Sequence, residues 1–164
     1  MNSLLFRPAS KHDLPSIIDM LADDPLGQMR ETNIARLKGD KVERDYLRAF
    51  EAIDGDPNNH LIIAEVEVSG RPEIVGVLQL TFIASLTYEG GTRAQVEGVR
   101  VHKKWRNQHI GKQLLHHAIN VSKERGCALI QLTSDRKRDD ALSFYERLGF
   151  VKSHWGFKLQ LRDH

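Results

Sequence analysis

A basic stretch from Val99 to Lys112 contains the residue types that could hold a phosphate group. Its sequence is Val-Arg-Val-His-Lys-Lys-Trp-Arg-Asn-Gln-His-Ile-Gly-Lys, with five lysines or arginines and no acidic residue. An apolar alternation typical of a strand comes first, and a helical pattern begins at Ile110. The first turn of a helix offers free N–H groups and a partial positive charge, and the glycine at position 111 lets a ligand approach the backbone. The stretch therefore predicts a pyrophosphate cradle at a strand-loop-helix corner.

Apolar spacing predicts the elements around this corner. A strand from Ala94 to Val101 precedes it, and a helix from Ile110 to Arg125 follows it and ends at Gly126. Next comes a strand from Ala128 to Thr133, whose apolar composition predicts burial on both faces. The last expected elements are a helix at Asp139–Leu148 and two strands at Phe150–Ser153 and Phe157–Leu161.

The first half of the chain predicts the rest of the sheet. A short strand covers Leu4–Arg7, and Ser10 to Asp13 resembles a capping box before a helix. The helical stripe consists of Leu14, Ile17, Ile18 and Leu21. A helix at Asp40–Ala52 and a hairpin of strands at Leu61–Val68 and Ile74–Ile83 follow. The order β-α-α-β-β-β-α-β-α-β-β predicts an α/β fold with a mixed sheet.

The composition predicts one soluble globular domain, residues 1–164, with 40% hydrophobic and 28% charged residues. The net charge of +2 gives no reason to expect a nucleic-acid partner. Cys127 is the only cysteine, so an intramolecular disulfide is excluded. Residues Met1 to Pro8 lack the apolar core of a signal peptide, and no apolar run is long enough to span a bilayer. We therefore expect a cytoplasmic location and no membrane partner.

Other chemistries find little support in the residues. The chain has no His-Glu-x-x-His pattern and one cysteine, so no metal site is predicted. A P-loop and a glycine fingerprint after the first strand are both absent. Trp105 beside His102 and Lys104 suggests base stacking, but one aromatic in a basic loop more often packs as a lid. A second basic cluster, Arg136–Arg138, is equally well explained as solvated surface.

Two segments of the chain resemble the GNAT N-acetyltransferases. Val101 to Gly111 is similar to their motif A, a strand followed by Arg/Gln-x-x-Gly-x-Gly/Ala at a helix start, with His109 in place of the first glycine. Ala141 to Phe150 resembles motif B, Ala-x-x-Phe-Tyr-x-x-x-Gly-Phe. A strand separates the motifs, as it does in the family, and the element order matches along nearly the whole chain. Arg138 stands where many family members have Asn.

The resemblance implies an α/β fold with a mixed, mostly antiparallel central sheet flanked by helices. It also implies transfer of acetyl from acetyl-CoA, the co-substrate, to a primary amine, by direct attack in a ternary complex. The residues expected to bind acetyl-CoA are Val99, Arg100, Val101, Arg106, Asn107, Gln108, His109, Ile110, Gly111, Lys112 and Arg138.

Chemistry defines three further roles. An alkylammonium has a pKa near ~10.4, so exposing the free amine at pH 7 costs about 4–5 kcal/mol, part of which a general base relieves. The attacked thioester develops negative charge on oxygen, which an N–H donor stabilises. By the resemblance that donor is the amide of Val101, and the acid that protonates the leaving thiolate is Tyr145. The alternative for Tyr145 is a core aromatic.

Glu97 is the candidate general base. It is the only carboxylate between Gly90 and Lys123. It lies four residues before Val101, on the same face of the strand unless a bulge intervenes. The alternatives are a surface carboxylate at this position, or a base supplied by a water chain.

The acceptor is expected to be a small-molecule amine, but its identity does not follow from the sequence. By the resemblance it lies among residues 23–32, 86–91 and 133–135, which contain both acidic and basic side chains. Two alternatives stay open, a catalytically weak acyl-CoA-binding sensor or regulator and a protein or peptide acetyltransferase. A homodimer is a possible assembly.

Overall fold

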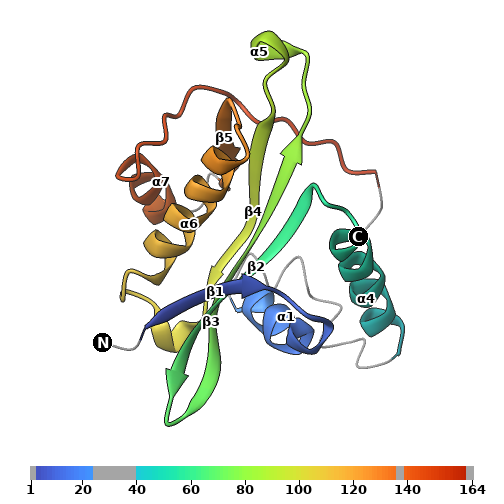
Figure 1. Ribbon diagram of the computed structural model, residues 1–164, viewed down its shortest axis with the longest axis vertical. Helices are drawn as coiled ribbons and strands as arrows, with labels where there is room; N and C mark the ends of the chain where they lie inside the picture. The colour runs from blue at the N-terminus through green and yellow to red at the C-terminus, as the bar shows by residue number, and fades with distance from the viewer. Residues whose placement is uncertain (1–2, 24–39, 136–138, 162–164) are drawn as a thin grey trace.

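The computed structural model describes residues 3–23, 40–135 and 139–161 (Figure 1). A sheet of five strands has the order β1-β2-β3-β4-β5. The strands are β1 (Leu4–Pro8), β2 (Asn59–Val68), β3 (Arg71–Ile83), β4 (Arg93–Val101) and β5 (Leu129–Leu132). The first three pairings are antiparallel and only β4 and β5 run parallel. This confirms the expected α/β fold with a mixed, mostly antiparallel sheet.

Helices cover both faces of the sheet. The α-helices are α1 (Leu14–Ala22), α4 (Asp40–Asp54), α5 (Thr87–Gly90), α6 (Ile110–Glu124) and α7 (Asp139–Glu146), and the short 3-10 helices are η1 (Lys11–Asp13) and η2 (Lys103–Trp105). Figure 1 shows α6 and α7 on one side and α1 and α4 on the other. We call these the α6 face and the α1 face of the sheet.

Each face of the sheet has its own apolar core. On the α6 face, residues such as Leu78, Leu80 and Val96 pack against Leu114 and Leu115 and are almost fully buried. A smaller core on the α1 face consists of Ala9, Ile17, Met20, Phe50, Ile63 and Val77. Strand residues therefore alternate between two buried faces over the middle of β2 and β3.

A β-bulge interrupts β4 at Gly98 and Val99. Glu97 pairs with Gln79, but Arg100 pairs with Val77, so two residues of β4 oppose one residue of β3. Gly98 has φ +61°, a torsion that favours glycine. The bulge reverses the alternation beyond it, which decides how the site residues face.

Three expectations about the strands are wrong. The final strands at Phe150–Ser153 and Phe157–Leu161 are absent, and residues 151–161 form an exposed extended segment. All four residues of β5 are half-buried rather than buried on both faces, because β5 has a neighbour on one side only within the described chain. A strand is defined by backbone hydrogen bonds to a neighbouring strand, and in the part of the chain that the structure describes no strand pairs with the last segment.

An ion-pair network fixes the start of the chain to the sheet. The Arg7 guanidinium donates to both carboxylate oxygens of Asp13, at 2.7 and 3.0 Å, and to Glu65 at 2.8 Å. The Asp13 carboxylate also accepts from the Ser10 amide at 2.7 Å, as the expected capping box requires. These hydrogen bonds, that from Arg7 first, lower the pKa of Asp13 below its ordinary value of 3.8.

Replacing Asp13 by Asn should reduce the free energy of unfolding by about 1–3 kcal/mol, because the Arg7 charge loses its main partner. The lowered pKa means that the carboxylate stabilises the fold above its ordinary pKa and that this contribution is lost as the pH falls towards the lowered value. Asp13→Asn should therefore lose less stability than the wild type on acidification below about pH 5. Urea unfolding at several pH values measures both effects. The exposed Asp19→Asn is the control, and equal behaviour of the two variants would contradict the assignment.

Candidate functional site

The strands β4 and β5 stop pairing halfway along β4. Their ladder joins Arg93–Val96 to Leu129–Leu132, and β4 then continues to Val101 while β5 ends. Among the described residues, no strand pairs with β4 beyond Val96 on that side. The bulge at Gly98 lies at this point. The result is an opening in the sheet, which we call the β4 opening, bordered by a stretch of β4 that no neighbouring strand of the described residues pairs with on that side.

The amide of Val101 points into the β4 opening. The next amide, that of His102, donates to the Val75 carbonyl of β3 at 2.9 Å. Successive amides of an extended strand point to opposite edges, so the Val101 N–H is directed away from β3. It is a fixed donor at the edge where β5 has ended, which is what a substrate carbonyl or developing oxyanion requires.

The start of α6 lies directly beyond this edge. His109 caps the helix with φ +60° and ψ +9°, and Asn107 also has a positive φ of +63°. His109 thus adopts a left-handed torsion, a conformation that favours glycine and in which histidine is also enriched among the other residues. The first intrahelical bond runs from the Gln113 amide to the His109 carbonyl at 3.0 Å. The three preceding amides have no partner in the helix and are available for an anion.

Gly111 is the second residue of α6 and lies next to Val101 of β4. A Cβ built on it would lie 3.5 Å from Phe144 Cζ and 3.5 Å from Val101 Cγ2, which is ordinary van der Waals contact. The protein itself therefore leaves room for alanine here. Because glycine has no Cβ, the backbone at position 111 stays open to a ligand. These residues therefore fit a ligand cradle. Ile110 next to it is buried in the core on the α6 face and can offer only its backbone.

The predicted basic side chains are less free than the sequence suggests. The Arg106 guanidinium donates to the Asp23 carboxylate at 3.0 Å, to the Asp23 carbonyl at 3.2 Å and to the Val101 carbonyl at 3.3 Å. It ties the end of α1 to the loop before α6. Arg100 pairs with Val77, so its side chain lies on the α1 face, and it donates to the Val99 carbonyl at 2.9 Å. Lys112 is exposed. Arg138 lies outside the described residues.

Other loop residues have structural partners. Gln108 donates to the Lys104 carbonyl at 3.3 Å. Trp105 packs against the core on the α6 face, and its indole N–H donates to Glu73 at 3.0 Å, which confirms the expected packing lid. Val99 and Val101 pack against the same core.

Tyr145 lies on α7, beside the same core. Its ring is 5.2 Å from that of Phe144 and 5.9 Å from that of Phe150, both edge-on. Phe144 in turn lies near Gly111, so motif B packs against the helix start of motif A. The structure thus brings Val101, Gly111 and the motif B aromatics together.

The side chain of Glu97 lies on the opposite face of the sheet from that of Val101. It pairs with Gln79, on the α1 face, whereas Val101 pairs with Gly76 and packs on the α6 face. Glu97 and Val101 would share a face in a regular strand. The bulge inserts one residue between them and so puts them on opposite faces. Glu97 is exposed, and the adjacent Gly98 approaches Leu21 of α1. Glu97 therefore lies near the end of α1, where the expected acceptor segment 23–32 begins. Within that segment, 24–32 lies outside the described residues.

Sequence reasoning missed a polar strip on the α1 face near β5. Asn59 accepts from Gln79 at 3.1 Å and from Thr81 at 2.7 Å, and Gln131 donates to Gln95 at 2.8 Å. Polar residues at every second position of β3 and β4 are the signal that could have revealed it. Glu97 continues the strip along β4.

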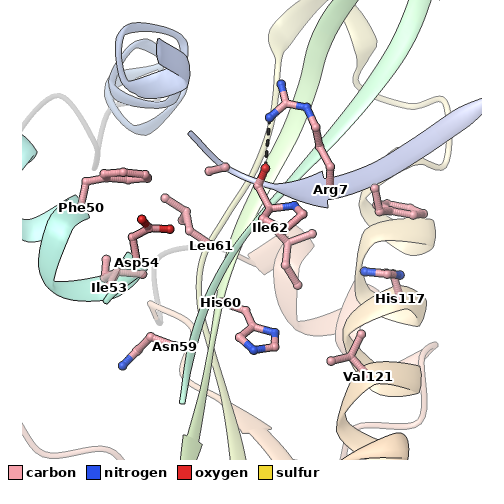
Figure 2. A pocket seen from close by; sticks show the side chains of 13 residues that line it. Arg7, Phe50, Ile53, Asp54, Asn59, His60, Leu61, Ile62, His117 and Val121 are labelled. Atoms are coloured by element: carbon pink, nitrogen blue, oxygen red, sulfur yellow. Dashed lines mark hydrogen bonds between the residues drawn. The ribbon is translucent and has the colours of Figure 1, made fainter. Parts of the chain in front are cut away.

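A separate cavity of about 320 Å³ lies where β1 leaves the sheet (Figure 2). Figure 2 shows His60 and His117 on its wall, from β2 and α6. Burial lowers the pKa of both imidazoles, and Arg125 adds to the effect at His60. None of the predicted site residues lines this cavity.

In the ranges 3–23, 40–135 and 139–161, no group of three or more His, Cys, Asp or Glu side chains is placed to hold a metal ion. Every helix in those ranges is too short or too polar to cross a bilayer.

Comparison with known proteins identifies the family. The model of the Acetyltransferase (GNAT) family matches residues 21–150, and the chain belongs to this family. An aminoalkylphosphonate N-acetyltransferase from Salmonella typhimurium is 33% identical over 123 residues, covering 71% of this chain and 75% of that protein. A glucosamine 6-phosphate N-acetyltransferase from Trypanosoma brucei brucei is 34% identical over 88 residues, covering 54% of this chain and 58% of that protein.

Solved structures give the same fold. One described as a transcriptional regulator from Bacillus halodurans C-125 is 48% identical, with a TM-score of 0.85, and covers 97% of this chain and 100% of its own. Another, described as a predicted acetyltransferase from Clostridium acetobutylicum with acetyl-CoA, is 17% identical, with a TM-score of 0.67, and covers 97% of each chain. At that identity the second shows the fold alone.

Gly111 gives a direct test of the cradle. Gly111→Asp places a carboxylate where the helix start would receive phosphate, so CoA binding should weaken about tenfold or more. An acidic residue in the first turn stabilises a helix, so this loss would not come from unfolding. Isothermal calorimetry with CoA measures the affinity and circular dichroism the fold. Gly111→Ala, for which the structure has room, controls for helix propensity, and unchanged affinity in a folded Gly111→Asp protein would exclude the cradle.

Proposed function

We propose that this protein is an N-acetyltransferase that transfers acetyl from acetyl-CoA to the primary amine of a small molecule. The observation that carries the proposal is the β4 opening next to the start of α6. A fixed strand amide and three free helix amides converge there, beside a glycine that leaves the backbone accessible. Relatives named for aminoalkylphosphonate and glucosamine 6-phosphate acetylation support a small amine as acceptor.

The chain divides the binding of acetyl-CoA between two elements. The amides of residues 107–112 hold the pyrophosphate, with Lys112 adding positive charge at the surface. The edge of β4 at Val99 and Val101 holds the pantetheine arm by backbone hydrogen bonds. Arg100, Arg106 and Arg138 are proposed to assist through their charges, and Arg106 must then exchange or share its bond to Asp23.

Val101 and Tyr145 act on the acetyl group at its two ends. The Val101 N–H donates to the thioester oxygen as negative charge develops there during attack by the amine. Tyr145 donates its phenolic proton to the sulfur as the carbon–sulfur bond breaks, and regains a proton from solvent. Tyr145 lies on the element that packs against Gly111, which supports this placement.

Tyr145→Phe keeps the ring and removes the proton donor. We expect kcat to fall roughly 10²–10⁴-fold while CoA affinity changes little. Steady-state kinetics with thiol detection, together with calorimetry, separate the two quantities. Phe144→Leu on the same helix serves as the packing control. A Tyr145→Phe enzyme with wild-type kcat would make Tyr145 a core aromatic only.

Glu97 is proposed as the general base, directly or through one water. It is exposed on the α1 face beside the bulge, and the opening allows an amine on that face to reach a thioester held at β4. Glu97 takes one proton from the ammonium before attack and releases it to solvent after transfer, and the nitrogen gives its second proton to solvent as the tetrahedral intermediate collapses to the amide. The competing bases are a water chain or an acceptor-loop carboxylate such as Asp24 or Glu31.

Glu97→Gln preserves the shape and removes the base. We expect kcat/KM to fall and the acid limb of its pH profile to disappear, because that limb reports the ionisation of the base. Adding Gln79→Glu to the Glu97→Gln variant moves the carboxylate to the paired position. This double variant tests whether any carboxylate on this face is sufficient to act as the base. A pH profile unchanged by Glu97→Gln would assign the base to a water chain or to an acceptor-loop carboxylate instead.

A regulatory role is the second candidate, since the 48% identical structure is described as a transcriptional regulator. The two functions differ in turnover. An acetyltransferase releases CoA when mixed with acetyl-CoA and a panel of aminophosphonates, amino sugars, amino acids and polyamines, whereas a sensor binds acetyl-CoA without release. The single domain over 1–164 and the cytoplasmic location stay predictions.

A further inference from the structure

Arg93, the first residue of β4, lies at the end of the polar strip on the α1 face. The next residues but one along the strand, Ala94 and Val96, are buried in the core on the α6 face. The pairing of β4 with β3 is regular from Arg93 to Glu97, and side chains of a strand alternate between its faces. The side chains of Arg93, Gln95 and Glu97 therefore share the α1 face, with a positive charge at one end and a negative charge at the other.

The half-buried Arg93 guanidinium has unused donors and no counter-ion in the structure. Its Nη2 donates to Ser85 Oγ at 3.3 Å. Its Nε is buried without a hydrogen-bond partner, and its Nη1 also has no partner but is not buried. Within residues 3–23, 40–135 and 139–161, Arg93 forms no ion pair. A partly desolvated cation with unused donors is costly, and an anion bound to it removes much of that cost.

The sheet surface between Arg93 and Glu97 is polar but uncharged. Gln95 lies between them on β4, and its side-chain oxygen accepts from Gln131 of β5 at 2.8 Å. The β3 residues that pair with Gln95 and Glu97 are a threonine and a glutamine. This surface offers hydrogen bonds to a ligand but holds no charge that would repel an anion at Arg93 or compete with Glu97 for an ammonium group.

We propose that Arg93 binds an anionic group of the acceptor while Glu97 meets its amine. The inference rests on the proposed function and names its substrate class, a primary amine joined to a carboxylate, phosphonate or phosphate. The guanidinium fork binds such oxyanions through two parallel hydrogen bonds. Arg93 touches the acceptor but no reacting atom, so it determines specificity rather than the chemical step.

The spacing of the two charges limits the acceptor further. Arg93 and Glu97 are four residues apart, which is about 13 Å along a strand. Side chains lean along the strand direction, so the long side chain of Arg93 shortens this gap without closing it. The acceptor must therefore hold its amine and its anionic group several bonds apart, which excludes an α-amino acid that binds both residues at once.

A series of matched primary amines tests the proposal. Amines with chains of about three to five methylene groups carry a phosphonate, a carboxylate or, as the neutral set, a hydroxyl at the other end. Thiol release at saturating acetyl-CoA gives kcat/KM for each. The wild type should prefer the best anionic acceptor over its matched amino alcohol about tenfold to a hundredfold, because a hydrogen-bonded charge is bound more tightly than a hydroxyl. The phosphonate and carboxylate sets show which oxyanion Arg93 prefers.

Arg93→Gln should remove this preference by raising KM for the anionic acceptors, and should leave kcat/KM for the amino alcohols unchanged. Arg71→Gln is the matched control and should keep the preference, since Arg71 is exposed at the turn between β2 and β3, at the other end of β3. A wild type that uses the amino alcohols equally well would overturn the proposal. An Arg93→Gln enzyme that keeps the preference, or loses activity equally on all three sets, would also overturn it. The proposed function survives each of these results.

Calorimetry distinguishes failure of this proposal from failure of the proposed function. 4-Aminobutylphosphonate titrated into the enzyme with CoA should bind, and Arg93→Gln should weaken this binding about tenfold or more. If no amine is acetylated but the Arg93-dependent binding is present, the proposed function fails and the anion site stands. If no amine is acetylated and binding is absent or unchanged by Arg93→Gln, both are overturned.

Discussion

The site depends on one break in backbone pairing. The strands β4 and β5 share a ladder over Arg93–Val96 only, and the bulge at Gly98 turns β4 where the ladder stops. A buried strand edge without a partner is costly unless something else supplies hydrogen bonds. The start of α6 faces the same region with its own unpaired amides. A ligand with amide and phosphate groups satisfies both sets at once, which is why the fold and the proposed co-substrate belong together.

The bulge also separates the two halves of the proposed chemistry. Val101 and the motif B aromatics lie with α6, and Glu97 lies with α1. In the proposed reaction the acetyl donor and the amine therefore approach from opposite faces of the sheet and meet at the β4 opening. Arg106 crosses between these sides through its bonds to Asp23 and Val101, so binding at one side is linked to the start of the acceptor segment.

Much of this architecture follows from local sequence. Apolar periodicity placed the helices α1, α4, α6 and α7 and the first four strands, since each has a regular buried face. The sequence is compatible with a bulge between Glu97 and Val101, but only the pairing with β3 places it at Gly98 and Val99. The expectation of two final strands is wrong because the apolar alternation of residues 151–161 is typical of a strand but does not specify a partner edge. The expectation that β5 is buried on both faces is wrong because that burial depends on a neighbour that local sequence does not specify. The left-handed turn at Tyr88 and Glu89 in α5 has no sequence signal, since neither is a glycine.

The proposed mechanism requires acetyl-CoA to lie in the β4 opening with its thioester oxygen on the Val101 amide. A crystal structure of the full chain with acetyl-CoA tests it most directly. We expect the pantetheine arm to be hydrogen-bonded along residues 99–101 and the pyrophosphate to lie against the amides of 107–112. Acetyl-CoA bound elsewhere, for example in the cavity lined by His60 and His117, or a Val101 amide turned away from the thioester, would contradict it.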